Sequence, residues 1–480
     1  MASPYRDARQ DAAPRTTDDG IVDDLVRQFA DPYAFFRELV QNGIDAGASE
    51  LRIQLIFEKD GSFQASVRDD GSGMTPEILE GELLVLFKSG KENREDAIGK
   101  FGVGFISVFA LGPERVTVRT TRGHGPLWTL HLFPDHAYEI FEGAGGSRPG
   151  TTVSVEVGPG REPDDVAAKA EASLRRWCRH ARIPLHFRVA GPGRPEHTVR
   201  IDTPLGLDDQ LAVVKLKAGK TDALLGLPRE PEGRYAGFFN AGLMLHETRE
   251  GAGLLGGLAY KVQDPRLEHT LSRDDVRRDR AHAKALGVVQ RGIPRLRAAL
   301  LAQLEQAAAG DDAAAFATLT RRVLDEATRL RIDVEDVPMA LLEPLEGRRI
   351  ARLADVAKRV VLGRSRTPLT AALAEAGWAV LDGQRNEARM LNAVVRRLGN
   401  LAAAEERFTL ALPVPARPSD DALLGQLEAR LDDAWRRPVR PRFAELLGRE
   451  DGAVAVGMRE GALAEGTLPD PFALLGRAGL

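Results

Sequence analysis

The chain has 480 residues, with 66 Lys and Arg against 70 Asp and Glu, so its formal net charge is −4. This balance excludes a strongly basic protein that would bind nucleic acid or an acidic membrane through its overall charge. Any phosphate-binding site must therefore depend on a local group of residues. Hydrophobic residues at 43% and charged residues at 28% are close to globular averages, which excludes wholesale disorder, collagen or a coiled-coil rod. The length predicts two to four domains.

The single cysteine, Cys178, indicates a reducing compartment, because it can form neither an internal disulfide nor a thiolate zinc cage. The first thirty residues contain no apolar signal-peptide core, and no run approaches the roughly 18 apolar residues of a membrane span. We therefore expect a cytoplasmic protein without a membrane anchor. The nine histidines include no His-Glu-x-x-His pattern, so we do not expect a transition-metal site.

The N-terminal part of the chain predicts a helix followed by antiparallel strands. Residues 1–20 are polar and aperiodic, which is typical of a loose tail. Asp31-Pro32 is a good helix start, and the apolar spacing predicts a helix over 32–46. Alternating apolar residues on both sides of Asp60-Gly61 predict a hairpin, and Thr75-Pro76 starts another helix. This order favours an α+β layered fold.

Further along the chain the pattern changes twice. A helical pattern from Asp164 to Arg182 is broken at Ile183-Pro184. Residues 195–280 mix strands with turns, and long Ala/Leu/Arg helices are expected over 281–330. Residues 352–382 predict a short strand-helix-strand unit, and Asp420 to Trp435 predicts one more helix.

Three clusters of residues could carry chemistry. Glu38, Asn42 and Asp45 are spaced by four and three, so they project from one face of the predicted helix. Alone, they would be a solvated face. The second cluster, Asp69-Asp70-Gly71-Ser72-Gly73-Met74, follows a strand, where glycines let the backbone approach a ligand and an acid can accept from a purine amino group. Alone, it would be an Asp-Gly turn.

The third cluster is the glycine-rich stretch from Ile98 to Ser107, which opens a predicted helix. Free backbone N–H groups at a helix N-terminus can cradle phosphate, and Lys100 or Lys88 can add charge. The stretch is not a P-loop, because no Ser or Thr follows Lys100. A Rossmann fingerprint is also excluded, because the glycines of the second cluster are followed by Pro76.

Together, in this order, the clusters resemble the GHKL, or Bergerat, ATP-binding fold. Four motifs of that family are matched, namely the N-box by 38–46, the first Gly box by 69–74, the second by 99–105 and the closing Thr strand by 150–153. Within that superfamily the chain is most similar to the heat shock protein 90 family chaperones. The residues that indicate this branch are Phe87-Lys88-Ser89-Gly90, Leu271-Ser272-Arg273-Asp274 and the helix from Ser173 to Pro184.

The resemblance spans about 20–395 and implies a Bergerat α/β sandwich followed by an α/β middle domain, ribosomal S5-like plus a small Rossmann-like unit. A short, mostly helical C-terminal region follows. We therefore expect a loose tail over 1–20, an ATP-binding domain over 21–185, a middle region over 186–395 and a C-terminal region of unknown role over 396–480. The lid region, 77–98, is shorter than is usual in those chaperones.

The resemblance also implies ATP and Mg²⁺ as cofactors, with a role for each matching residue. Asn42 would coordinate Mg²⁺, and Glu38 would orient or deprotonate the attacking water. Arg273, from the second module, would stabilise charge on the γ-phosphate; its plainer interpretation is a structural surface arginine. Asp69, Gly73 and Thr151 would hold the adenine base. The other implied ATP-binding residues are Asp45, Met74, Lys88, Gly102, Val103, Gly104 and Phe105.

The function implied is an ATP-dependent, chaperone-like ATPase that uses nucleotide-driven domain closure to act on unfolded or metastable client proteins, with roles in protein folding and stress response. A nucleotide-dependent homodimer is left open. The alternative is a GHKL ATPase of a DNA-transaction or defence system, mismatch-repair-like or chromatin-remodelling-like, because the segment from Glu38 to Ser49 also resembles the N-box of those branches. A histidine-kinase relative is disfavoured, since no dimerising helix with a phosphorylatable His precedes Glu38.

Two further features belong to the helix that starts near Asp164. Cys178 is expected in the core, beside Trp177. The arginines of this helix form a basic edge that we interpret as a solvated face, with an acidic partner or nucleic acid as the functional alternative. These arginines are Arg175, Arg176, Arg179 and Arg182.

Overall fold

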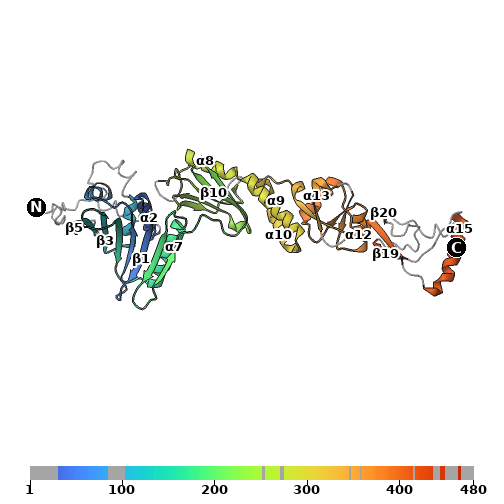
Figure 1. Ribbon diagram of the computed structural model, residues 1–480, viewed down its shortest axis with the longest axis horizontal. Coiled ribbons are helices and arrows are strands. Elements are labelled where there is room, and N and C mark those ends of the chain that lie inside the picture. Colours follow the sequence, from blue (N-terminus) through green and yellow to red (C-terminus); the bar gives the residue numbers. More distant parts are fainter. Residues whose placement is uncertain are drawn as a thin grey trace. The chain divides into compact units, whose positions relative to one another are not determined.

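The protein is described by a computed structural model (Figure 1). The residues described are 31–84, 103–135, 137–250, 255–270, 275–344, 348–356, 359–413, 417–435, 444–448 and 463–465. The chain forms two compact units. The first takes the chain up to Gln210 together with Lys215–Gly226 and Glu232–Gly292, and the second takes Leu211–Val214, Leu227–Pro231 and Ile293–Leu480.

An eight-stranded sheet dominates the first unit, in the order β5-β4-β3-β6-β2-β1-β7-β8. All of its neighbouring strands are antiparallel except β1 and β7, which are parallel. The strands are β1 (Leu51–Phe57), β2 (Phe63–Asp69), β3 (Arg115–Arg122), β4 (Leu127–Leu132), β5 (Tyr138–Gly143), β6 (Pro149–Val157), β7 (Leu185–Ala190) and β8 (His197–Arg200).

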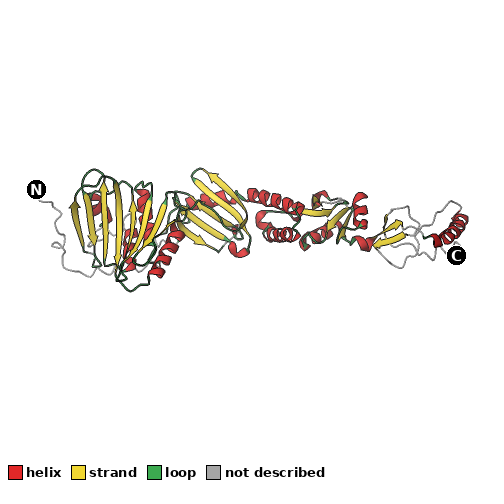
Figure 2. Ribbon diagram, turned by 60° about the horizontal axis from the view of Figure 1, so that its bottom comes forward, coloured by secondary structure: helices red, strands yellow, loops and turns green. Residues whose placement is uncertain are grey.

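Helices cover one face of this sheet (Figure 2). The longer ones are α2 (Phe35–Asp45) and α7 (Pro163–Cys178), and the shorter ones are α3 (Pro76–Ile78), α6 (Val103–Ile106), a π-helical turn (Leu79–Leu83) and a 3₁₀ turn (Ser107–Leu111). The predicted hairpin and the helices that flank it are therefore confirmed, as is the α+β fold class.

Apolar and polar side chains alternate along the strands, which explains why the helices cover one face of the sheet. In β1, Leu51, Ile53 and Leu55 are fully buried, and they pack in one core with Phe35 and Phe36 of α2. Each such side chain contributes about 1.5–3 kcal/mol by leaving water. The residues between them in β1 are polar and belong to the opposite face of the sheet.

Cys178 lies in the same core, as the sequence predicts, and it is fully buried at the end of α7. Burial raises the pKa of its thiol to about 12. A thiol of this kind stays protonated at neutral pH and packs as a small apolar side chain. The residue therefore has a structural role in the contact between α7 and α2.

A second, five-stranded sheet completes the first unit, in the order β12-β11-β13-β10-β9. Asn240 ends one strand of this sheet and Leu243 begins the next, with Ala241 and Gly242 between them at positive φ, so the two antiparallel strands form a hairpin. The elements are β9 (Gln210–Ala218), β10 (Thr221–Pro228), β11 (Tyr235–Asn240), β12 (Leu243–Thr248), β13 (Ala259–Gln263), a 3₁₀ turn (Pro231–Gly233) and α8 (Arg280–Gln290).

The second unit begins with helices and contains a four-stranded sheet in the order β15-β14-β17-β16. Its predicted strand-helix-strand unit is confirmed, with Val361 of β16 opposite Val380 of β17 in a parallel pair. The elements are α9 (Ile293–Ala309), α10 (Ala313–Asp325), α11 (Ala327–Leu330), β14 (Pro338–Leu342), β15 (Arg348–Arg352), β16 (Val360–Gly363), α12 (Pro368–Glu375), β17 (Ala379–Asp382), α13 (Ala388–Leu398), α14 (Ala404–Arg407) and 3₁₀ turns at Val334–Asp336 and Leu353–Asp355.

The C-terminal region contains more strand than the sequence indicates. The predicted helix is present as α15 (Asp421–Trp435), preceded by a 3₁₀ turn (Pro418–Asp420). Three strands form a further small sheet, in which β18 (Phe408–Pro413) lies between β19 (Ala444–Gly448) and β20 (Leu463–Glu465). Each strand is short and its partner lies far away in sequence, so the local pattern is weak.

Within the residues that the structure describes, no helix is both long enough and apolar enough to cross a bilayer.

Candidate functional site

The first predicted cluster lies on α2, as expected. Phe35 and Leu39 point into the core, whereas Glu38 is half-buried and Asn42 and Asp45 are exposed. The carboxylate of Asp45 accepts a hydrogen bond from the Gln41 side chain, Nε2 to Oδ1, at 2.9 Å. Partial burial raises the pKa of Asp45, and the bond from Gln41 opposes this shift. The helix thus presents two carboxylates and one amide on its outward face.

Asp69, the last residue of β2, is the best-defined side chain of the second cluster. Its Oδ1 accepts from the backbone N–H of Gly71 at 2.8 Å and from that of Thr151 at 3.3 Å. Both bonds go to Oδ1, so Oδ2 has no hydrogen bond among the described residues. Burial raises the pKa of Asp69, and the two amide bonds oppose that shift. One carboxylate oxygen is therefore fixed by the fold and the other is available to a donor.

Thr120 of β3 links the first Gly box to the Thr strand. Its hydroxyl oxygen accepts from the backbone N–H of Met74 at 2.8 Å and lies 3.0 Å from Oγ1 of Thr151. The side chain is fully buried. The sequence reasoning missed this residue. The available signal was the strand alternation, which places residue 120 on the same face as Val116 and Val118.

Gly73 needs to be glycine for two physical reasons. Its φ is +65°, a conformation that residues with a Cβ rarely adopt, and a Cβ at this position would overlap the carbonyl oxygen of Thr121. We expect Gly73→Ala to lower the free energy of unfolding by at least about 2 kcal/mol, from backbone strain and the clash together. Urea unfolding followed by circular dichroism measures this loss.

Gly47 offers the matched control. Its φ is +75°, but no atom of the neighbouring described residues would lie within 4 Å of an added Cβ. Gly47→Ala should therefore cost only the strain of the left-handed backbone, about 1 kcal/mol. Equal losses for the two variants would show that close contact with Thr121 contributes nothing.

The third predicted cluster is described only in part. Helix α6 begins at Val103, and Gly104 and Phe105 belong to its single turn. The Ser107 hydroxyl donates to the carbonyl oxygen of Gly104 at 2.5 Å. Phe105 is buried in the core of the first unit. Lys88, Gly102 and Arg273, which the resemblance also assigns to the site, lie outside the described residues.

Asp70, beside Asp69 in the sequence, has a different environment. Its Oδ1 accepts from the backbone N–H groups of Ser49 at 2.7 Å and Glu50 at 3.1 Å, and Oδ2 accepts from the Ser49 hydroxyl. Slight burial works to raise the pKa of Asp70, but these hydrogen bonds lower it overall. Asp70 therefore stabilises the turn at Ser49 and Glu50 with both of its carboxylate oxygens. Asp69, in contrast, keeps one carboxylate oxygen without a hydrogen bond among the described residues.

Protein groups alone form no metal cage in the part of the chain that the structure describes, where no three His, Cys, Asp or Glu side chains gather suitably. The metal that the resemblance implies is Mg²⁺. Mg²⁺ usually keeps several waters and binds through one or two protein oxygens together with substrate phosphates. The exposed amide of Asn42 is a suitable oxygen donor of that type.

Residues 35–137 match the family described as "Histidine kinase-, DNA gyrase B-, and HSP90-like ATPase". The chain is also similar to proteins named Chaperone protein HtpG. The relative from Treponema pallidum is 24% identical over 190 residues, covering 32% of this chain and 30% of that protein. The relative from Chromobacterium violaceum is 26% identical over 184 residues, covering 32% and 28%, and that from Nitrosospira multiformis is 27% identical over 183 residues, with the same coverage.

Residues 35–137 therefore match a GHKL-type ATPase domain. Its relatives named above are heat shock protein 90 family chaperones, as the sequence motifs predict. The matched part spans about 30% of the length of these relatives.

Proposed function

We propose that this protein binds and hydrolyses ATP in the presence of Mg²⁺ and uses the nucleotide cycle to act, like a chaperone, on unfolded or metastable proteins. The proposal is supported by hydrogen bonds that bring separate sequence motifs into contact. Asp69 is tied to Thr151 through Oδ1, and Thr151 is tied through Thr120 to Met74. These motifs occur together in the GHKL family.

Binding of adenine is supported by the open Oδ2 of Asp69. A carboxylate held by two amides on one oxygen can accept from an exocyclic amino group on the other. Gly73 lets the main chain pack directly against Thr121, because any Cβ at this position would collide with the carbonyl oxygen of Thr121. The resemblance also assigns Gly73 to the adenine site, where a residue without a side chain would let the base lie close to the main chain.

Hydrolysis is supported by the order of side chains on α2. Glu38 is one helical turn before Asn42, so the two project from the same side of the helix. In the proposal, Asn42 supplies an oxygen to Mg²⁺, which neutralises phosphate charge. Glu38 does not coordinate the metal in this proposal, and it orients a water or removes its proton. Lys88, Gly102, Val103 and Gly104 would add charge or backbone donors, and Arg273 would complete the site after domain closure.

We also propose that the chain divides into an ATP-binding domain over 21–185, a middle region over 186–395 and a C-terminal region over 396–480. In the same proposal the protein forms a nucleotide-dependent homodimer and is cytoplasmic.

A second candidate is a GHKL ATPase that works on DNA. One observation favours it, namely the polar sheet face opposite the helices. A hollow of about 800 Å³ on this face is lined by five arginines, which are Arg52, Arg68, Arg115, Arg119 and Arg148. Of the five, Arg52 and Arg115 form ion pairs with neighbouring glutamates. Guanidinium groups on an open sheet can contact phosphates, and such binding would weaken steeply with salt.

Steady-state ATP hydrolysis distinguishes the two candidates. We expect the full chain to hydrolyse ATP slowly on its own, and several-fold faster with a chemically unfolded model protein. Duplex DNA should leave the rate unchanged. Stimulation by DNA that disappears at high salt would favour the second candidate, and tight ATP binding without turnover would indicate a nucleotide-sensing switch. Each rate is compared with that of Glu38→Ala, which reports contaminating ATPases.

A further inference from the structure

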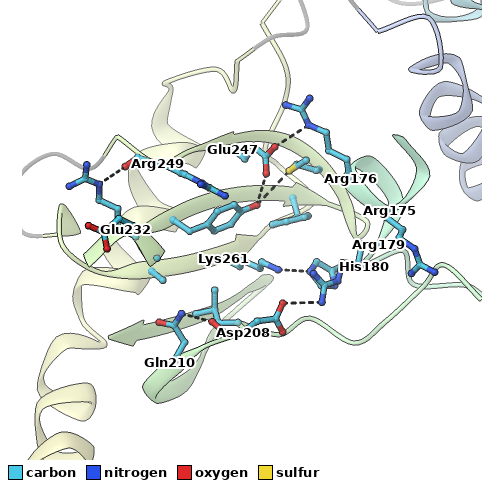
Figure 3. A pocket seen from close by; sticks show the side chains of 17 residues that line it. Arg175, Arg176, Arg179, His180, Asp208, Gln210, Glu232, Glu247, Arg249 and Lys261 are labelled. Atoms are coloured by element: carbon cyan, nitrogen blue, oxygen red, sulfur yellow. Dashed lines mark hydrogen bonds and ion pairs between the residues drawn. The ribbon is translucent and has the colours of Figure 1, made fainter. Parts of the chain in front are cut away.

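A second pocket in the first unit shares no residue with the Asp69 site. It encloses about 550 Å³ and lies between the end of α7, the loop at Asp208 and the sheet strands β11, β12 and β13 (Figure 3). Six cationic side chains line it, against three carboxylates, although the whole chain is slightly acidic. The cations are Arg175, Arg176, Arg179, Arg234, Arg249 and Lys261, and the carboxylates are Asp208, Glu232 and Glu247. This excess of positive charge is local.

Lys261 on β13 is the innermost of these cations, with a residue exposure of 7%. Its Nζ lies 2.8 Å from Nε2 of His180, and the rings of Tyr235 and Phe239 lie 5.6 and 5.9 Å away. Among the described residues it forms no ion pair with a carboxylate. Buried charges in proteins are normally paired, so an ammonium group in this setting favours an anionic ligand.

His180 is arranged to accept from Lys261. Its Nδ1 lies 3.1 Å from the carbonyl oxygen of Thr203, which can only accept, so Nδ1 carries the proton and Nε2 has a free lone pair. Burial, and then the charge of Lys261, lower the pKa of His180 to about 4. The ring is therefore neutral at pH 7, and its Nε2 accepts a hydrogen bond from one of the three N–H groups of Lys261. The other two donors remain available.

Arg176 near the end of α7 and Arg179 directly after that helix lie at the mouth of the pocket. Arg176 donates through Nε to Glu247 at 3.0 Å, and Arg179 donates through one terminal nitrogen to Asp208 at 3.0 Å (Figure 3). Their side chains remain 52% and 42% exposed. These ion pairs hold the guanidinium groups in place while leaving other N–H groups free to bind. The basic edge of this helix is thus more than a solvated face.

We propose that this pocket binds a small anion with two or more acidic groups, of the phosphate or carboxylate class. Lys261 contacts one acidic group inside the pocket, and Arg176 and Arg179 contact another at the mouth. Guanidinium forks match the geometry of both carboxylate and phosphate. The proposal is independent of ATP hydrolysis, because none of these residues belongs to the Asp69 site.

Binding should depend on pH through Lys261. Burial first, and then Arg179, lower the pKa of Lys261 to about 8, while Asp208 and Glu247 oppose this shift. An anion favours the charged ammonium, so affinity is high below about pH 8 and falls as pH rises through that value. His180 titrates well below this range, and burial raises the pKa of Tyr235 above its ordinary value, so neither accounts for a change near pH 8.

Isothermal titration calorimetry of the full chain tests the proposal with citrate and with inorganic pyrophosphate. We expect saturable binding of at least one of them, and whichever binds more tightly identifies the acidic group that the pocket prefers. Lys261→Met should weaken that binding at least about tenfold and remove its dependence on pH. The pH series uses citrate or, if only pyrophosphate binds, that anion, with its own protonation measured in parallel. Lys284→Met, which removes an exposed lysine on α8, is the matched control.

Arg176→Gln is a second variant in case Lys261→Met fails to fold, which circular dichroism would reveal. It changes an exposed side chain and should weaken binding several-fold. Two results would overturn the proposal. One is the absence of saturable binding of both anions to the unaltered protein, and the other is equal affinity in the unaltered protein and in every folded variant at positions 261 and 176.

Discussion

Asp69→Asn should lower the affinity for ATP about 10- to 100-fold and leave the fold intact. The amide oxygen of asparagine can still accept from Gly71 and Thr151, as Oδ1 does now. Its NH₂ group, however, takes the place of Oδ2 and presents a donor where the adenine amino group needs an acceptor. The loss corresponds to about 1.5–3 kcal/mol, the usual value for a hydrogen bond to a charged group. Calorimetric titration with a non-hydrolysable ATP analogue measures it.

Asp70→Asn is the matched control for this change. Asp70 is adjacent in sequence, but its carboxylate is occupied by Ser49 and the backbone of Glu50. This variant should keep its ATP affinity within a few-fold while losing about 1 kcal/mol of stability. If both variants bind ATP as the unaltered protein does, Asp69 does not hold the base.

The pH dependence of binding should follow the same carboxylate. Burial raises the pKa of Asp69, so its acceptor form is lost at a higher pH than for an exposed aspartate. ATP affinity should therefore fall as pH is lowered through this raised pKa. An adenine amino group that donates to the carboxylate favours its ionised form, so bound ATP should lower the pKa again.

Glu38→Ala should reduce turnover about 10²- to 10⁴-fold, the usual contribution of a general base, and change ATP affinity little. The reason is that Glu38 lies on the outward side of α2, one turn from Asn42, and takes no part in the bonds that join Asp69, Thr120 and Thr151. Single-turnover hydrolysis with ATP bound to all of the protein separates the chemical step from binding.

Glu38→Gln distinguishes the loss of the proton-accepting carboxylate from the loss of side-chain volume. It keeps the size and removes the proton-accepting carboxylate, so it should be as inactive as the alanine variant. Normal turnover in Glu38→Gln would mean that another group activates the water, and the proposed role of Glu38 would then be wrong.

Periodicity within short segments predicted much of the fold. The helix carrying Glu38 and Asn42 was predictable because both its apolar spacing and its polar face repeat within a few residues. The unit at Val361 and Val380 was predictable because apolar runs and helix signals follow one another closely. The resemblance to GHKL proteins also came from the sequence, because its motifs are short and contiguous.

The sequence could not show which of these residues meet. Thr120 bonds to Met74 across 46 positions and reaches Thr151 on the neighbouring strand, a register that only the assembled sheet defines. The same holds for Lys261 and His180, which are 81 positions apart. Sequence by itself therefore determined the α+β class and the chemical groups available. Tertiary structure decided which oxygen of Asp69 is open and left the buried Lys261 without a carboxylate partner among the described residues. The reason is that burial and hydrogen bonding depend on contacts that strand pairing creates far along the chain.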